Sequence, residues 1–244
     1  AMSSPPARRW PAIGAVLFAL GFPGVFTWVY FVALRDSLGA IQQAAYALGK
    51  TIQFAFPLFW VLAVQRRRPA WPRAVCAGLG WGFAFGLLVF AVGVAAYFAW
   101  LKPAGVLQEA GGAVQAKIAG FGVRTVPAYL LLGVFYSLIH SLLEEYYWRW
   151  FVFGQLRTMI PWKAAVGVSS LGFMAHHVVL LATYFGWSSP AAYLFSSAVA
   201  VGGAFWAWLY QRSQSLLGPW LSHLLIDAAI FAVGYDLVRA MFHA

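Results

Sequence analysis

The chain has 244 residues, of which 63% are hydrophobic and only 9% are charged, and its formal net charge is +10. A soluble domain carries about 25% charged residues, so this composition excludes an ordinary soluble protein. The apolar runs are longer than the strands of an outer-membrane barrel, which leaves a helical membrane protein. Because the cations fall mostly between the apolar runs, they favour a role in membrane topology over nucleic-acid binding.

A transmembrane helix needs about 20 mostly apolar residues. The sequence contains seven such runs, at 11–34, 41–64, 74–100, 125–156, 163–186, 190–210 and 216–241. The second run is the least typical of a span, because Gln42, Gln43, Lys50 and Gln53 dilute it. We therefore predict an all-α polytopic bundle of about seven transmembrane helices.

The segment 101–124 is too polar to span a membrane. Its apolar residues show partial helical periodicity, which is consistent with an interfacial helix or lid on the membrane surface. A plain loop fits the same residues equally well. An interfacial helix would be the eighth helix of the bundle.

The charges between the spans predict an orientation. One side collects nine cations and no acid, namely Arg8, Arg9, Arg66, Arg67, Arg68, Arg73, Arg157, Lys163 and Arg212. The other side collects Arg35, Lys50, Lys102, Lys117, Arg124 and Arg239 together with Asp36, Glu109 and Asp236. This bias predicts a cytoplasmic N-terminus and an external C-terminus. The arginines at 66–68 are interpreted as a topology signal, with a lipid-headgroup site as the alternative.

The fourth span carries an unusual set of polar residues, His140, Glu144, Glu145 and Arg149. A charge at the centre of a bilayer costs between ~3 and ~10 kcal/mol, so such residues face a protein interior or a wet cavity and usually serve function. Residues four apart share one face of a helix, so Glu145 and Arg149 are expected to form an ion pair. Glu144 is then free to act as a general base. A single packing network of all the charges is the alternative.

Two later spans carry the remaining candidates. His176 and His177 lie in the fifth span, and adjacent helical residues point about 100° apart, so one of them is expected to face a site and the other to pack. His223 and Asp227 lie in the seventh span and share one face. Asp227 could orient the His223 ring, both could point into a common cavity, or the pair could simply hold helices together.

A carboxylate with several histidines and a second acid suits hydrolysis by an activated water. The zinc-protease pattern HExxH and the serine-hydrolase pattern GxSxG are both absent from the sequence. A non-enzymatic membrane protein and a proton-coupled transporter are the alternatives, because intramembrane Glu and His also build proton relays.

Three motifs follow one another in the second half of the chain: EEYYWR at 144–149, FMAHH at 173–177 and HLLID at 223–227. In this order they resemble the EExxxR, FxxxH and HxxxN/D motifs of the CPBP family, which includes the type II CAAX prenyl endopeptidases and the bacterial Abi proteins. The resemblance covers about 120–241. It implies one integral-membrane domain over 1–244, with N-terminal spans at 1–119 and a catalytic core at 120–241.

The resemblance also implies roles for the motif residues. Glu144 and His177 would activate the water, His223 and Asp227 would form the oxyanion side, and Glu145 and Arg149 would support the site. Phe173 marks the second motif, and counting four residues from it selects His177 over His176. Many relatives carry Asn where this chain carries Asp227, and an ionised Asp cannot donate a hydrogen bond to an oxyanion. Asp227 must therefore orient His223, be protonated or bind a cation.

The family resemblance favours an enzyme without a metal. Zinc is the alternative cofactor, held by Glu144, His177 and His223, and His140 could complete that set. The expected activity is an intramembrane endopeptidase that cuts a membrane-anchored protein or peptide near a C-terminal anchor or lipidated segment. The expected location is the bacterial cytoplasmic membrane, with the lipid bilayer and no nucleic acid as a partner. A non-catalytic immunity or scaffold protein of the Abi type is the alternative within the family.

Overall fold

The computed structural model describes residues 9–72 and 74–242, and within them the regular structure is entirely helical. Seven helices are long and apolar enough to cross a membrane. They are Trp10–Ala33, Gly39–Val64, Leu79–Leu101, Val126–Leu156, Trp162–Phe185, Pro190–Ser213 and Leu217–Phe242. The predicted all-α polytopic bundle is confirmed, and each predicted run corresponds to one of these helices.

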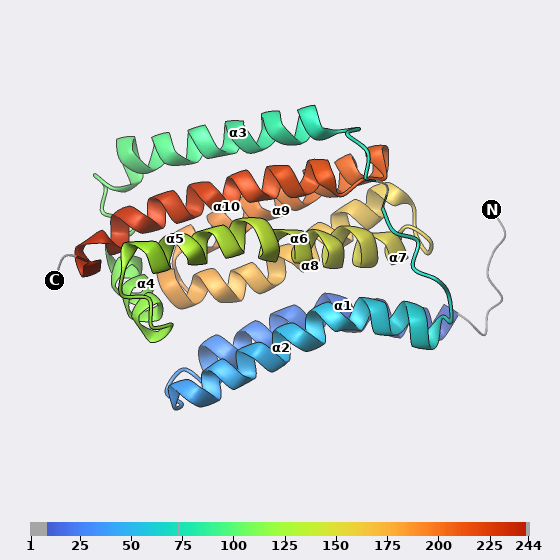
Figure 1. The fold of residues 1–244 in the computed structure, drawn as a ribbon, viewed down its shortest axis with the longest axis horizontal. Helices are drawn as coiled ribbons and strands as arrows, with labels where there is room; N and C mark the ends of the chain where they lie inside the picture. The colour runs from blue at the N-terminus through green and yellow to red at the C-terminus, as the bar shows by residue number, and fades with distance from the viewer. Residues whose placement is uncertain (1–8, 73, 243–244) are drawn as a thin grey trace.

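The first two helices form a hairpin on one side of the bundle (Figure 1). They are α1 (Arg9–Trp28) and α2 (Gly39–Phe59), and each continues into a short π-helical segment. α1 packs against α8 (Trp162–Phe185), whereas α2 makes few contacts with the rest of the bundle. The residues that α2 buries are Gly49, Gln53 and Pro57.

On the opposite side, α3 (Leu79–Ala96) packs along α10 (Leu217–Val238) (Figure 1). Gly82 and Gly86 form a GxxxG pattern on the contact face, and such small residues let two helix backbones approach closely in a membrane. A Cβ atom placed on Gly82 would lie only 2.1 Å from the carbonyl oxygen of Gly218. This span begins five residues later than predicted, because Gly78 is left-handed (φ +86°) and breaks the helix there.

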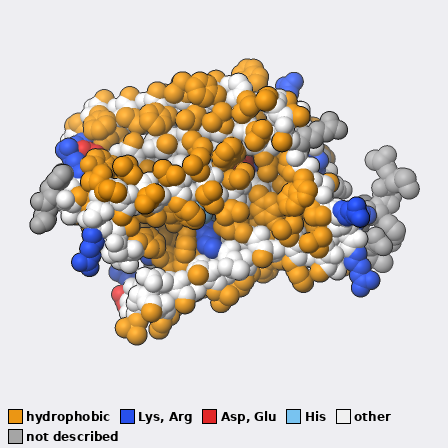
Figure 2. All heavy atoms as spheres, in the orientation of Figure 1, with side chains coloured by type: hydrophobic (Ala, Val, Ile, Leu, Met, Phe, Trp, Pro, Cys, Tyr) orange, Lys and Arg blue, Asp and Glu red, His pale blue; other side chains and the backbone are white. Residues whose placement is uncertain are grey.

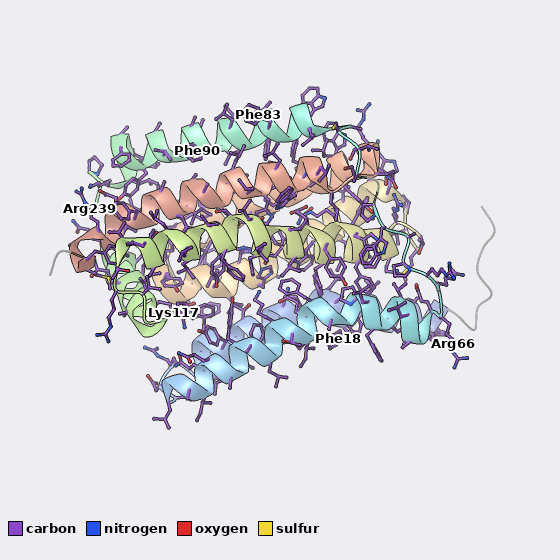
Figure 3. The ribbon with its side chains drawn as sticks, viewed as in Figure 1. Phe18, Arg66, Phe83, Phe90, Lys117 and Arg239 are labelled. Carbon is purple, nitrogen blue, oxygen red and sulfur yellow. The ribbon has the colours of Figure 1, made fainter. Side chains whose placement is uncertain are left out.

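The polar segment between the third and fourth spans contains α4 (Gln108–Gly120), which decides in favour of a helix over a loop. Its Lys117 ammonium lies 4.0 Å from the ring centre of Tyr30 and 5.0 Å from that of Phe31, both in the π-helical turn after α1. Figure 3 shows Lys117 at the end of the molecule where α4 lies. These cation–π contacts attach α4 to the α1–α2 hairpin.

The fourth span runs through the middle of the bundle (Figure 1). It consists of α5 (Val126–Val134), α6 (Ser141–Glu145) and α7 (Gly154–Leu156), joined by the π-helical segments Phe135–His140 and Tyr146–Phe153. The short α6 therefore lies between two π-helical segments. Such segments are rare and are frequently found at functional sites.

The last three helices are α8, α9 (Pro190–Ser213) and α10, and they complete the core around the fourth span. Figure 2 shows a broad hydrophobic surface along the bundle, with most of the basic side chains at its two ends. An apolar exterior of this kind suits a protein whose solvent is lipid, so the chain is an integral membrane protein.

Three residues that the orientation argument counted in external connections lie elsewhere. Lys50 is inside α2, about 16 Å along the helix from Gly39 at 1.5 Å per residue, because α2 continues unbroken past its polar residues. Asp236 is inside α10, where Tyr97 and Lys102 contact it at 2.7 and 2.5 Å. Arg239 lies in the 3₁₀ turn that ends the last span (Figure 3). Of the cations counted on the other side, Arg8, Arg73 and the Arg9 side chain lie outside the described residues.

Candidate active site

Side chains from three helices converge at one buried place in the second half of the chain. α6 contributes Glu144, α8 contributes His176 and α10 contributes His223, and these residues are only 4%, 7% and 5% exposed. They come from separate spans, so the fold brings together residues that lie up to 79 positions apart. The sequence predicted this meeting of the fourth, fifth and seventh spans.

Glu144 lies at the centre of the cluster. Its Oε1 atom is 3.9 Å from Nε2 of His140 and 3.9 Å from Nε2 of His176, and its Oε2 atom is 3.7 Å from Nε2 of His223. These distances exceed a hydrogen bond, and no described residue donates one to this carboxylate. Gaps of this size suit polar groups that interact through a water molecule. Glu144 can therefore accept a proton from a molecule held between it and the imidazole rings.

Glu145, unlike Glu144, has close polar partners, and it is fully buried. Its Oε1 atom is 2.9 Å from the guanidinium of Arg149 and 2.8 Å from Nδ1 of His223. The ion pair expected from the four-residue spacing is present, and it extends to a third group on α10. Since a carboxylate can only accept, the Nδ1–H group of His223 is the donor, which fixes the ring and turns Nε2 towards Glu144.

The guanidinium of Arg149 contacts two aromatic rings and a backbone carbonyl as well as Glu145. Its guanidinium carbon lies 4.8 Å from the ring centre of Phe173 and 4.7 Å from that of Trp206. Its NH2 group also points at the carbonyl oxygen of Gly203, 3.5 Å away. Arginine suits this place because its flat, weakly hydrated guanidinium can stack between aromatic rings. The second motif thus supplies Phe173 as packing for the first motif's arginine.

Of the two adjacent histidines on α8, the one close to Glu144 is His176, whereas the motif selects His177. His177, which the motif selects, places its Nδ1 atom 2.9 Å from the carbonyl oxygen of Phe173. His176, to which the motif assigns no role, has its Nε2 atom 3.9 Å from Glu144 and stacks on Trp148 with the ring planes 5° apart. The two imidazole centres are 4.2 Å apart, so both belong to the same cluster. Spacing alone could not separate them, because the ring orientation depends on packing against Trp148.

Asp227 lies at the edge of the cluster. Its Oδ1 atom is 3.7 Å from Nε2 of His223, and its side chain is 17% exposed. The Nδ1–H group of His223 donates the hydrogen bond that fixes its ring to Glu145, 2.8 Å away, so the orienting role considered for Asp227 belongs to Glu145. Asp227 instead faces the same imidazole nitrogen that faces Glu144.

Two polar residues of the first half of the chain also belong near this cluster, and neither motif nor resemblance pointed to them. The ring of Phe54 on α2 packs edge-on against the rings of His140 and Tyr147. Lys50 lies four residues before Phe54 and Gln53 lies directly before it, so both residues are close to the Phe54 side of α2. The signal in the sequence was a lysine and a glutamine at helical spacing within an apolar span.

The donor set was also tested against a metal. Among the residues that the structure describes, no group of three His, Cys, Asp or Glu side chains is arranged to hold a metal ion. Nδ1 of His223 is committed to Glu145, and Nδ1 of His177 to a backbone carbonyl. These bonds engage only the Nδ1 atoms, and histidines that bind metals commonly make the same bonds, so zinc and the metal-free site both stay predictions.

The chain was compared with known proteins. Residues 126–229 match the family model described as type II CAAX prenyl endopeptidase Rce1-like. The matched segment begins with α5, ends within α10 and contains all three motifs. No curated protein and no solved structure matches the chain.

Proposed function

Because residues 126–229 form an Rce1-like domain of the type II CAAX prenyl endopeptidase family, a peptidase family, we propose that this membrane protein is a glutamate-type intramembrane endopeptidase. Its substrate would be a membrane-anchored protein or peptide, cut near a C-terminal anchor or lipidated segment. The observation that carries the proposal is Glu144, a buried carboxylate within 4 Å of imidazoles from its own helix, α8 and α10.

In the proposed reaction Glu144 takes a proton from a water molecule, and the water oxygen attacks the carbonyl carbon of the scissile peptide bond. His177 and His176 hold the water, and His140 faces the same carboxylate oxygen of Glu144 as His176 does. The tetrahedral intermediate then expels the amine as the C–N bond breaks, and Glu144 returns its proton to the leaving nitrogen. No metal takes part.

His223 supplies the oxyanion side of the proposed site. Its Nδ1–H group donates to Glu145, so an Nε2–H group on the doubly protonated ring can donate to the developing oxyanion. Asp227 acts through the same ring, with its Oδ1 atom 3.7 Å from Nε2. Glu145 and Arg149 position His223 and take no part in proton transfer to the substrate.

The test compares membrane proteomes by their terminal peptides in cells that carry the wild type or Glu144→Ala. New termini near membrane-embedded segments that appear only with the wild type identify substrates. Glu144→Gln keeps the size of the side chain and removes its basicity, so it controls for packing. If the cleavage products persist in both variants at matched protein levels, Glu144 is not the base.

We also propose that the protein lies in the bacterial cytoplasmic membrane with its N-terminus in the cytoplasm. The excess of cations before the first span and between the second and third, fourth and fifth, and sixth and seventh spans supports this orientation. The only cysteine, Cys76, is exposed and lies in the connection that carries Arg66, Arg67 and Arg68. A membrane-impermeant maleimide should label it only after the cells are permeabilised. Labelling of intact cells at the same rate would reverse the orientation.

A further inference from the structure

Lys50 is a charged residue that the proposed mechanism does not use. It lies in α2, a helix that is otherwise suited to lipid, and its side chain is partly buried. A lysine in the middle of a span costs several kcal/mol by most measures, so it normally faces a cavity and meets a partner. The partner of Lys50 is therefore informative about what the cavity binds.

No carboxylate lies within ion-pair distance of Lys50 among the side chains that the structure describes. Its ammonium contacts Oε1 of Gln53 at 3.3 Å and faces the Phe54 ring, 5.3 Å from the ring centre. An ammonium group has three donors, and the described contacts use one of them for a hydrogen bond.

Gln53 also has a hydrogen-bond donor without a described partner. It is 1% exposed, and its Nε2 atom has no hydrogen-bond partner among the described residues. A buried amide donor without any partner costs about 1–3 kcal/mol, so a water molecule or a ligand group has to complete it. Because Gln53 directs its oxygen to Lys50, its two N–H donors lie beside the free donors of the ammonium.

These donors lie one side chain away from the Glu144 cluster. Phe54 separates them from the catalytic helix, and its ring lies 6.0 Å from that of His140, which in turn is 3.9 Å from Glu144. Figure 2 shows a hollow along the seam between the α1–α2 hairpin and the rest of the bundle, with Lys or Arg atoms inside it.

We propose that Lys50 and Gln53 form a subsite that binds the free α-carboxylate at the C-terminus of a peptide substrate. This inference rests on the proposed peptidase function. A cationic donor and an amide donor require an acceptor with negative charge, and the C-terminal carboxylate is the one anion that every unmodified peptide supplies. Lys50 is then a specificity-determining residue, and cleavage takes place a short distance from the end of the substrate chain.

A second role for Lys50 makes a different prediction. If Lys50 served only to balance the charge of Glu144, its loss would slow the cleavage of all peptides equally. If it binds the substrate carboxylate, its loss slows only those peptides that have one. A substrate whose C-terminus is an amide therefore separates the two roles.

The experiment uses the purified full chain in nanodiscs and two synthetic peptides of the same sequence, one ending in a free carboxylate and one in an amide. The sequence is taken from a substrate found in the terminal-peptide comparison. The wild type should cleave the acid with a kcat/KM about 10- to 100-fold above that of the amide, mainly through KM. Lys50→Met should lower kcat/KM for the acid to that of the amide and leave the amide unchanged.

Lys50→Arg, which keeps the charge, should retain part of the preference for the acid. Gln43→Met is the matched control, because Gln43 is an exposed polar residue of the same helix. The proposal is overturned if the wild type cleaves acid and amide equally, or if Lys50→Met slows both equally while it unfolds at the wild-type temperature. If the wild type cleaves neither peptide, the proposed peptidase function fails as well.

Discussion

The network of Glu145, Arg149 and His223 permits a prediction whose size follows from the structure. The two charged residues are 0% and 2% exposed, and their closest atoms are 2.9 Å apart. Arg149→Met removes the guanidinium and leaves the buried Glu145 carboxylate with the Nδ1–H group of His223 as its remaining partner. Breaking a buried ion pair from one side costs about 3–5 kcal/mol.

Three contacts of the guanidinium disappear together in this variant: the pair with Glu145 and the stacks on Phe173 and Trp206. For a chain of 150–250 residues, 1 kcal/mol shifts the unfolding temperature by roughly 2–4 °C. Arg149→Met should therefore lower the unfolding temperature by roughly 6–20 °C, as measured by circular dichroism in detergent. Arg66→Gln is the control, because Arg66 is exposed and its loss should change the stability by no more than about 0.5 kcal/mol.

The double variant Glu145→Gln, Arg149→Met removes both charges. It should recover most of the lost stability, because no unpaired charge then stays in the bilayer. It should remain inactive, because a glutamine at 145 no longer requires the Nδ1–H tautomer of His223. The reasoning is refuted if Arg149→Met costs less than about 1 kcal/mol, or if the double variant is no more stable than the sum of the single effects.

Three further outcomes are expected. Gly82→Val should separate α3 from α10 and lower the unfolding temperature. Gly80→Ala is the control and should leave the unfolding temperature unchanged, because a Cβ atom at Gly80 would meet nothing within 4 Å. Equal unfolding temperatures for the two variants would contradict the close packing of α3 on α10. His177→Ala and His176→Ala should each reduce kcat for peptide cleavage by at least about tenfold, since both rings lie in the Glu144 cluster. If His176→Ala is fully active, only His177 helps to hold the water. Incubation with 1,10-phenanthroline followed by gel filtration should leave cleavage unimpaired; activity that is lost and then restored by Zn²⁺ would disprove the metal-free mechanism.

Much of the architecture follows from the sequence because the bilayer imposes it. A stretch of about 20 apolar residues has one stable arrangement in lipid, since every backbone polar group must find a partner within the helix. That rule alone located all seven spans to within five residues. It also located the candidate site, because charges such as those of Glu145 and Arg149 are too costly to face lipid and must meet inside the bundle.

Helical periodicity does not show which side chains from different helices meet, and the packing of the helices does. Spacing paired Glu145 with Arg149, but only the packing of α10 beside α6 shows that Glu145 also fixes the ring of His223. The choice between His176 and His177 likewise depends on the ring of Trp148, a contact between separate helices.

Lys50 shows the same division most clearly. From the sequence we predicted that this lysine dilutes an apolar run and belongs to the external cations, because a position on a helix says little until its neighbours are known. Only the position of the α1–α2 hairpin against the fourth span brings Lys50 and Gln53 near the Glu144 cluster, through the contact of Phe54 with His140. Local sequence fixes which residues can share a face because helix geometry is local, whereas the groups that they meet are fixed by long-range packing.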